Sequence, residues 1–70
     1  MEEKILQPHE QRVIDEKDDL ESKIKKLGPF ILDNPIFKTL PEEEQKDLNN
    51  QYDIMNQYLY ILQKRINQFK

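Results

Sequence analysis

Residues 48–69 read LNNQYDIMNQYLYILQKRINQF, and the spacing of their apolar side chains decides the fold. One row alternates steps of four and three, the period of an amphipathic helix, through Leu48, Tyr52, Met55, Leu59, Leu62, Ile66 and Phe69. A second row, Ile54, Tyr58 and Ile61, runs beside it and ends in Arg65. Residues three and four apart share a helix face, so the rows are neighbouring stripes. One helix of the same chain can cover only one stripe, so the second stripe predicts a partner chain, a ligand or both.

The small size of the chain limits how it can be stabilised. Its 70 residues predict one domain over 1–70, and a domain of this size buries only ~60% of its unfolded surface. The sequence has no Cys and one histidine, His9, which excludes disulfides, thiolate zinc sites and histidine metal sites. We therefore expect no metal or cofactor, and oligomerisation is the remaining source of stability. The lack of Cys also fits a reducing cytosol.

The charge pattern narrows the choice of partner. Charged residues make up 36% of the chain, with a net charge of −3, and bases alternate with acids, as in Glu16-Lys17-Asp18. This pattern argues against duplex nucleic acid, which selects a basic face. A small anionic ligand needs only two or three converging cations. We expect no membrane span and no signal peptide, because apolar runs are short and the N-terminus has no basic region before an apolar core.

Turn residues predict where the first helix begins and ends. Pro8 suits the first turn of a helix, and the apolar repeat of Val13, Leu20 and Leu27 continues from there. Gly28 followed by Pro29 is typical of a helix end with a left-handed cap. Helix one is therefore expected over about 8–27, with Lys23, Lys25 and Lys26 complementing the dipole in its last turn.

A connector and a second helix are expected to follow. The connector, residues 28–40, is too apolar for a free loop and should fold back over the end of a hairpin. Thr39 and Glu42 have capping-box spacing, while Pro41 favours opening the helix itself, so helix two is expected over about 41–69. The predicted fold is an all-α antiparallel two-helix hairpin with a partly ordered apolar connector, assembling into a homo-oligomer.

An antiparallel hairpin brings the start of helix one beside the end of helix two. His9 and Arg12 share a face in the first turns, and Arg65 arrives from the facing helix; together they suit phosphate groups. The alternative is that both arginines pair with nearby acids and that His9 is simply exposed. Tyr58 could stack on a purine or pack at a subunit interface.

Catalysis has little support in the sequence. There is no Ser–His–acid set, no Cys–His set and no glycine-rich phosphate loop. Acid pairs such as Asp18-Asp19 are better explained as a solvated helix face. We therefore expect a binding protein with no catalytic residues.

Three segments resemble a family of very small phage-encoded proteins related to a crAss-like phage protein. They are PHEQRVIDEK (8–17), FKTLPEEEQ (37–45) and MNQYLYILQKRI (55–66), so the similarity covers nearly the whole chain. That family is similar to the helical hairpin domain of viral anti-CBASS and anti-Thoeris sponges. His9, Gln11, Arg12, Tyr58 and Arg65 match the family and are the expected ligand-binding residues.

The resemblance implies an oligomer, often a hexamer, in the host cytoplasm. It would bind a cyclic di- or trinucleotide or a cyclic ADP-ribose-type signal without hydrolysing it, at sites between subunits. The Gly-Tyr-Arg and Met-Asn-x-Ile-Lys segments of the best-known anti-CBASS sponges are absent from the corresponding places, so their ligand residues do not transfer. The alternatives are a helical adaptor for a host or phage protein and, with less support, an enzyme that degrades a nucleotide signal.

Overall fold

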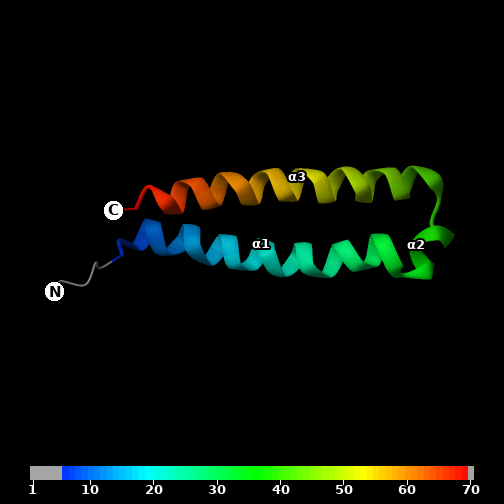
Figure 1. The fold of residues 1–70 in the computed structure, drawn as a ribbon, viewed down its shortest axis with the longest axis horizontal. Helices are drawn as coiled ribbons and strands as arrows, with labels where there is room; N and C mark the ends of the chain where they lie inside the picture. The colour runs from blue at the N-terminus through cyan, green and yellow to red at the C-terminus, as the bar shows by residue number, and fades with distance from the viewer. Residues whose placement is uncertain (1–5, 70) are drawn as a thin grey trace.

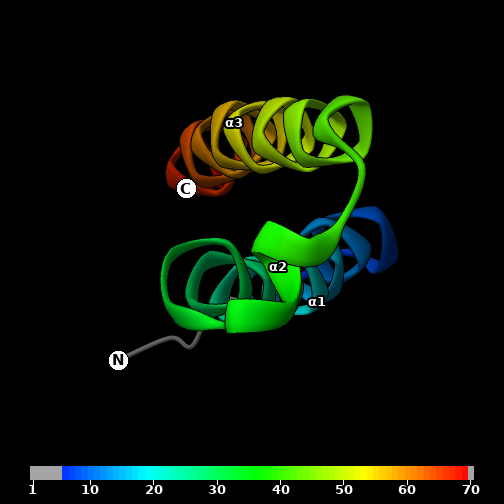
Figure 2. The same ribbon diagram turned by 90° about the vertical axis from the view of Figure 1, so that its right-hand side faces the viewer.

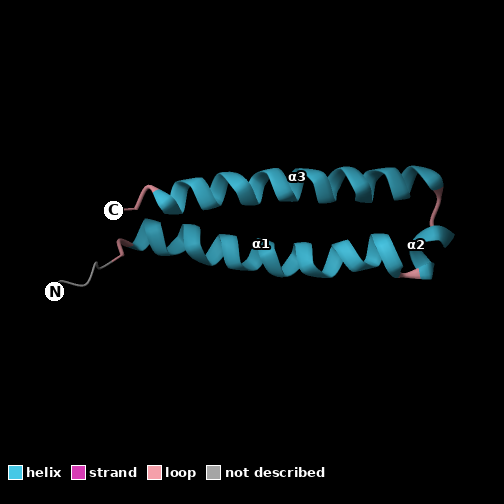
Figure 3. Ribbon diagram, viewed as in Figure 1, coloured by secondary structure: helices cyan, strands magenta, loops and turns pink. Residues whose placement is uncertain are grey.

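Two long antiparallel helices make up most of the structure. The computed structural model describes residues 6–69, which form three helices and no strand (Figure 3). They are α1 (Pro8–Asp33), α2 (Pro35–Thr39) and α3 (Glu42–Asn67). α1 and α3 lie side by side, with the short α2 at their turn (Figure 1). The all-α prediction is confirmed, and the described part of the chain is an elongated body of 55 × 16 × 15 Å.

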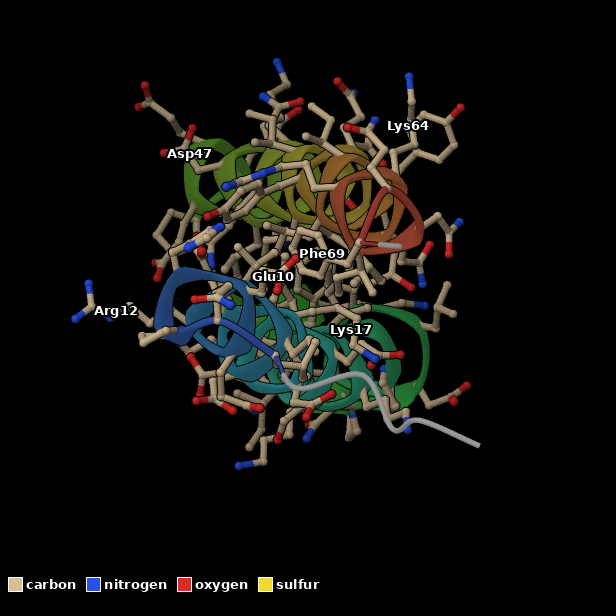
Figure 4. All side chains as sticks on the ribbon, turned by 90° about the vertical axis from the view of Figure 1, so that its left-hand side faces the viewer. Glu10, Arg12, Lys17, Asp47, Lys64 and Phe69 are labelled. Carbon is tan, nitrogen blue, oxygen red and sulfur yellow. The ribbon has the colours of Figure 1, made fainter. Side chains whose placement is uncertain are left out.

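The core is the seam between α1 and α3. Val13, Leu20 and Ile24 of α1 are buried there against Leu62 of α3, the only side chain of residues 6–69 with no exposed surface. Around them pack the half-buried residues Tyr52, Met55, Leu59, Ile66 and Phe69. These are members of the first predicted stripe, so its period identified the core face of α3. Figure 4, viewed along the helices, shows Phe69 between them.

Gly28 and Pro29 do not end the first helix. α1 continues through both of them to Asp33, and Gly28 has no positive φ, so the predicted end at Leu27 is wrong. The predicted connector over 28–40 is correspondingly shorter and is largely helical. Local propensity yields here to packing: Phe30 and Ile31 are half-buried in the continued helix, and the Phe30 ring meets Phe37 of α2 edge-on at 6.0 Å.

Gly28 instead allows α3 to approach α1 closely. It is buried near the turn end of α1, opposite Tyr52. A Cβ atom at this position would lie 3.1 Å from Tyr52 Oη and 3.4 Å from Tyr52 Cε1. The glycine thus makes room for the tyrosine ring, a role that depends on the facing helix and not on a turn.

Side chains of the turn fix the end of the hairpin. The Ile36 N–H donates to Asn34 Oδ1 at 2.9 Å, which caps α2, and the buried Phe37 then anchors it. Gln45 Nε2 donates to the Leu40 carbonyl at 2.9 Å and to the Lys38 carbonyl at 3.3 Å, tying α3 back to α2. Figure 2 shows α2 beside the end of α1, with the chain rising from it to α3.

The expected capping box of α3 does not form. Pro41 is the N-cap residue, and Thr39 Oγ1 donates to the Ile36 carbonyl within α2. α3 begins at Glu42, one residue beyond the predicted start, and ends at Asn67. Its acidic first turn and the basic pair Lys64 and Arg65 in its last turn complement the helix dipole as expected.

The contact between Gly28 and Tyr52 generates a stability prediction. Alanine favours a helix over glycine by about 0.8–1 kcal/mol, but in the wild-type chain the new methyl group would press on Tyr52 Oη. We expect Gly28→Ala to raise the melting temperature more in a Tyr52→Phe background than in the wild type. Thermal unfolding followed by circular dichroism of both single variants and the double variant measures the difference. Equal shifts in the two backgrounds would contradict the close-approach role.

Candidate functional site

The residues predicted to bind a ligand lie in the half of the hairpin opposite the turn. His9, Gln11 and Arg12 belong to the first turns of α1, and Arg65 belongs to the last turn of α3. Tyr58 precedes Arg65 by about two turns on α3. All five side chains are exposed, and 40% of the Tyr58 surface is accessible. The fold therefore brings the two sequence segments to one end of the molecule.

These side chains do not all point in one direction. Arg12 projects sideways, away from both helices, and Asp47 of α3 lies on the same side of the molecule (Figure 4). Asp47 and Arg65 are about five full turns apart, so Arg65 lies on that side as well. His9, three residues before Arg12, shares its face. We call this side of the hairpin the arginine side.

Gln11 lies on a different face of α1. Consecutive helical residues are rotated by about 100°, which turns Gln11 away from the face of Arg12. Its Nε2 donates to Asp15 Oδ1 at 3.0 Å, one turn along the same helix. The structure therefore groups Arg12 and His9 on the arginine side and leaves Gln11 outside that group.

The ion pairs of the described residues do not involve the two arginines. Within residues 6–69, salt bridges join Lys17 to Asp18 and Glu21 and join Lys23 to Asp19. The Lys17 ammonium group donates hydrogen bonds to Glu21 and Asp18, which raise its pKa, and it lies away from the arginine side (Figure 4). Glu10, an acid close to Arg12 in the sequence, accepts a hydrogen bond of 2.9 Å from the Gln7 N–H.

A cleft opens between the helices nearer the turn. It has a volume of about 380 Å³ and is lined by Lys23, Lys26, Leu27, Phe30, Gln51 and Met55. Phe30 is about five turns from Arg12 on α1, so the cleft opens on the arginine side. A second hollow of about 520 Å³ continues around Lys26 and Phe30 toward Asn34.

The lining of the cleft combines three kinds of group. Leu27, Phe30 and Met55 form an apolar floor, and the edge contact with Phe37 holds the Phe30 ring in place. The Lys26 ammonium group can meet phosphate oxygens, and that of Lys23 can do so by exchanging its exposed ion pair with Asp19, while the amide of Gln51 can donate and accept hydrogen bonds. A flat ring that carries phosphates matches this combination.

Sequence reasoning missed this cleft because it ended helix one too early. Lys23 and Lys26 were interpreted as last-turn cations, but α1 continues beyond them and its last turn holds no basic residue. The spacing of seven residues from Lys23 to Phe30 could have indicated the cleft, because it continues one helix face across Gly28 and Pro29. A connector that begins at Gly28 removes Phe30 from this face, so the cleft is not predicted.

The described residues contain neither a cluster of metal-ligating side chains nor a membrane-spanning helix. Residues 6–69 contain no group of three or more His, Cys, Asp or Glu side chains that could hold a metal ion. Nor does any helix in this range have the length and apolar character needed to cross a bilayer.

Comparison with known proteins gives one match. No curated protein matches the sequence, and no solved structure matches the fold. The family model Sequestin matches residues 7–68, which include all three helices and all the candidate ligand-binding residues. The name of the family indicates that a molecule is sequestered. The chain belongs to the Sequestin family.

Proposed function

We propose that the protein is a phage anti-defence sponge, which binds a cyclic nucleotide immune signal in the host cytoplasm and withholds it from its effector. The observation that carries the proposal is a cleft that sets Lys23 and Lys26 beside Phe30, in a chain that belongs to the Sequestin family. The lysines suit phosphates and the aromatic ring suits a base. Similarity to anti-CBASS and anti-Thoeris sponges supports a cyclic di- or trinucleotide or a cyclic ADP-ribose-type ligand.

The proposed mechanism requires binding alone. A sponge acts stoichiometrically: each occupied site removes one signal molecule, and the effector responds only to what stays free. Such a site needs charge complementarity and an apolar surface but no nucleophile, general base or metal. The exposed lysines and the open cleft meet that requirement, and we propose that the ligand leaves the protein chemically unchanged.

Arg12 and Arg65, with His9 and Tyr58 near them, form a second proposed contact group. Arg12 lies about 16 Å from Lys23, the nearer of the two cleft lysines, along α1, at 1.5 Å per residue. Phosphates of one small ligand do not span that distance within a single chain. We therefore propose that the two groups act on one ligand only if different subunits supply them. Gln11 faces elsewhere, and its contribution stays a prediction.

An adaptor role is the second candidate. The exposed apolar residues Ile54 (63% accessible) and Ile61 (52%) favour it, because such a stripe can receive a partner protein. An adaptor needs no small ligand and leaves Lys23 and Lys26 unoccupied. Ligand binding therefore separates the two functions.

The sponge proposal predicts retention without turnover. The protein is mixed with a panel of cyclic di- and trinucleotides and cyclic ADP-ribose isomers, and the free fraction is separated by ultrafiltration. We expect one class of compound to be depleted from the filtrate and then recovered intact after the protein is denatured, as chromatography and mass spectrometry would show. Recovery of a cleaved product would indicate an enzyme, and no depletion at all would favour the adaptor.

The cleft predicts which lysines the ligand needs. For a compound that the wild type retains, Lys23→Ala combined with Lys26→Ala should raise the dissociation constant at least about tenfold, because hydrogen bonds to charged groups contribute roughly 1.5–3 kcal/mol. Lys64→Ala is the matched control, since Lys64 lies over the Tyr60 ring on the outer side of α3. Isothermal titration calorimetry measures all three proteins. Wild-type affinity in the double variant would exclude the cleft.

The second contact group is tested in the same assay. Arg12→Ala should weaken binding of the retained compound without changing the oligomeric state, because the Arg12 side chain extends into solvent and packs on neither helix (Figure 4). Normal binding by this variant would remove Arg12 from the site while leaving the cleft in place.

A further inference from the structure

The second stripe of α3 is longer than its apolar part, and its two ends carry opposite charges. Steps of four and three run through Asp47, Gln51, Ile54, Tyr58, Ile61 and Arg65, and we call this set the α3 row. Its apolar centre is open to solvent, with Ile54 63%, Tyr58 40% and Ile61 52% accessible. Asp47 lies on the arginine side in Figure 4, and the spacing places the whole row there.

A single copy of the hairpin buries little apolar surface. Residues 6–69 contain five buried apolar side chains, of which Phe37 belongs to the turn and four to the seam. Chains of this size with no disulfide or metal normally gain the missing burial by association. The α3 row offers that burial as one continuous stripe, with Tyr58, a residue type enriched at interfaces, at its centre.

The order of residues in the row defines the partner. Around a midpoint at residue 56, Asp47 is the mirror position of Arg65, Gln51 that of Ile61, and Ile54 that of Tyr58. Two antiparallel copies of the row therefore place acid against base at both ends and apolar side chains together at the centre. A parallel arrangement would instead bring Asp47 against Asp47 and Arg65 against Arg65.

We propose that a second copy of the chain covers the α3 row, with the two α3 helices antiparallel and Asp47 of each copy paired with Arg65 of the other. A two-fold axis makes each contact occur twice, so one complementary pair provides two. Within residues 6–69, neither Asp47 nor Arg65 has a salt-bridge partner in its own chain. An unrelated partner protein gives no reason for the row to complement itself, which is why we assign a second copy.

This arrangement bears on the ligand site but does not depend on the proposed function. Gln51 lines the cleft and is one turn from Asp47. Arg65 of the second copy would therefore approach the cleft that holds Lys23 and Lys26. Arg12 and Lys23, which lie about 16 Å apart along α1 in one chain, belong to contact groups that would meet across the interface.

Charge reversal tests the pairing without any ligand. The protein is denatured, refolded to remove bound molecules, and studied by sedimentation equilibrium over a range of concentrations. Asp47→Arg alone and Arg65→Asp alone should each weaken self-association at least about tenfold, because each replaces two attractions by two repulsions. The double variant restores opposite charges at both ends and should associate about as tightly as the wild type.

Matched controls make the result specific. Lys64→Asp reverses the charge beside Arg65 on the outer side of α3 and should leave association unchanged. Circular dichroism confirms that each variant is helical, and rescue in the double variant keeps the test valid if a single variant loses helix. A wild-type monomer at all concentrations, or a double variant no tighter than the singles, would overturn the proposal. Either result would leave the retention assay and the lysine variants unaffected, because both concern the cleft of a single chain; only the Arg12→Ala test depends on association.

Discussion

The seam between α1 and α3 is the contact on which the rest of the structure depends. It buries Val13, Leu20 and Ile24 against Leu62, and Gly28 lets Tyr52 come close enough to continue it toward the turn. One helix partner covers one stripe of α3, so the α3 row stays exposed. Two features follow from this incomplete burial, a cleft between the helices and an open apolar surface. The open surface is the one on which we propose that two copies of the chain associate.

The periodic spacing of apolar residues predicted the fold better than the glycine and proline residues did. The four-three spacing from Leu48 to Phe69 identified the core face of α3, because that pattern depends on the whole helix. Gly28 and Pro29 misled the prediction, since their local preference to end a helix is outweighed by Phe30 packing on Phe37 and by Tyr52 filling the space over Gly28. Gln45, not Thr39, ties α3 to the turn, through bonds to the Lys38 and Leu40 carbonyls that sequence spacing does not reveal.

The candidate site was predictable in part. Sequence placed Arg12 and Arg65 at the same end of a hairpin; Figure 4 shows Arg12 on the arginine side with Asp47, and the five-turn spacing from Asp47 places Arg65 there. The rotation of about 100° between consecutive helical residues separates Gln11 from Arg12, but the sequence does not show which of the two lies on the side of Arg65, because that depends on the rotation of α1 about its axis. The cleft could not be predicted with helix one ending at Leu27, because Phe30 shares a face with Lys23 and Lys26 only on a continuous helix.

We propose that this member of the Sequestin family holds an intact signalling nucleotide in an assembly of more than one chain. Native mass spectrometry of the purified protein, alone and with a mixed panel of cyclic di- and trinucleotides and cyclic ADP-ribose isomers, tests it most directly. The account predicts an oligomer with an even number of chains that gains a fixed number of one unmodified ligand. A monomer, or an oligomer that gains no ligand from the panel, would contradict it.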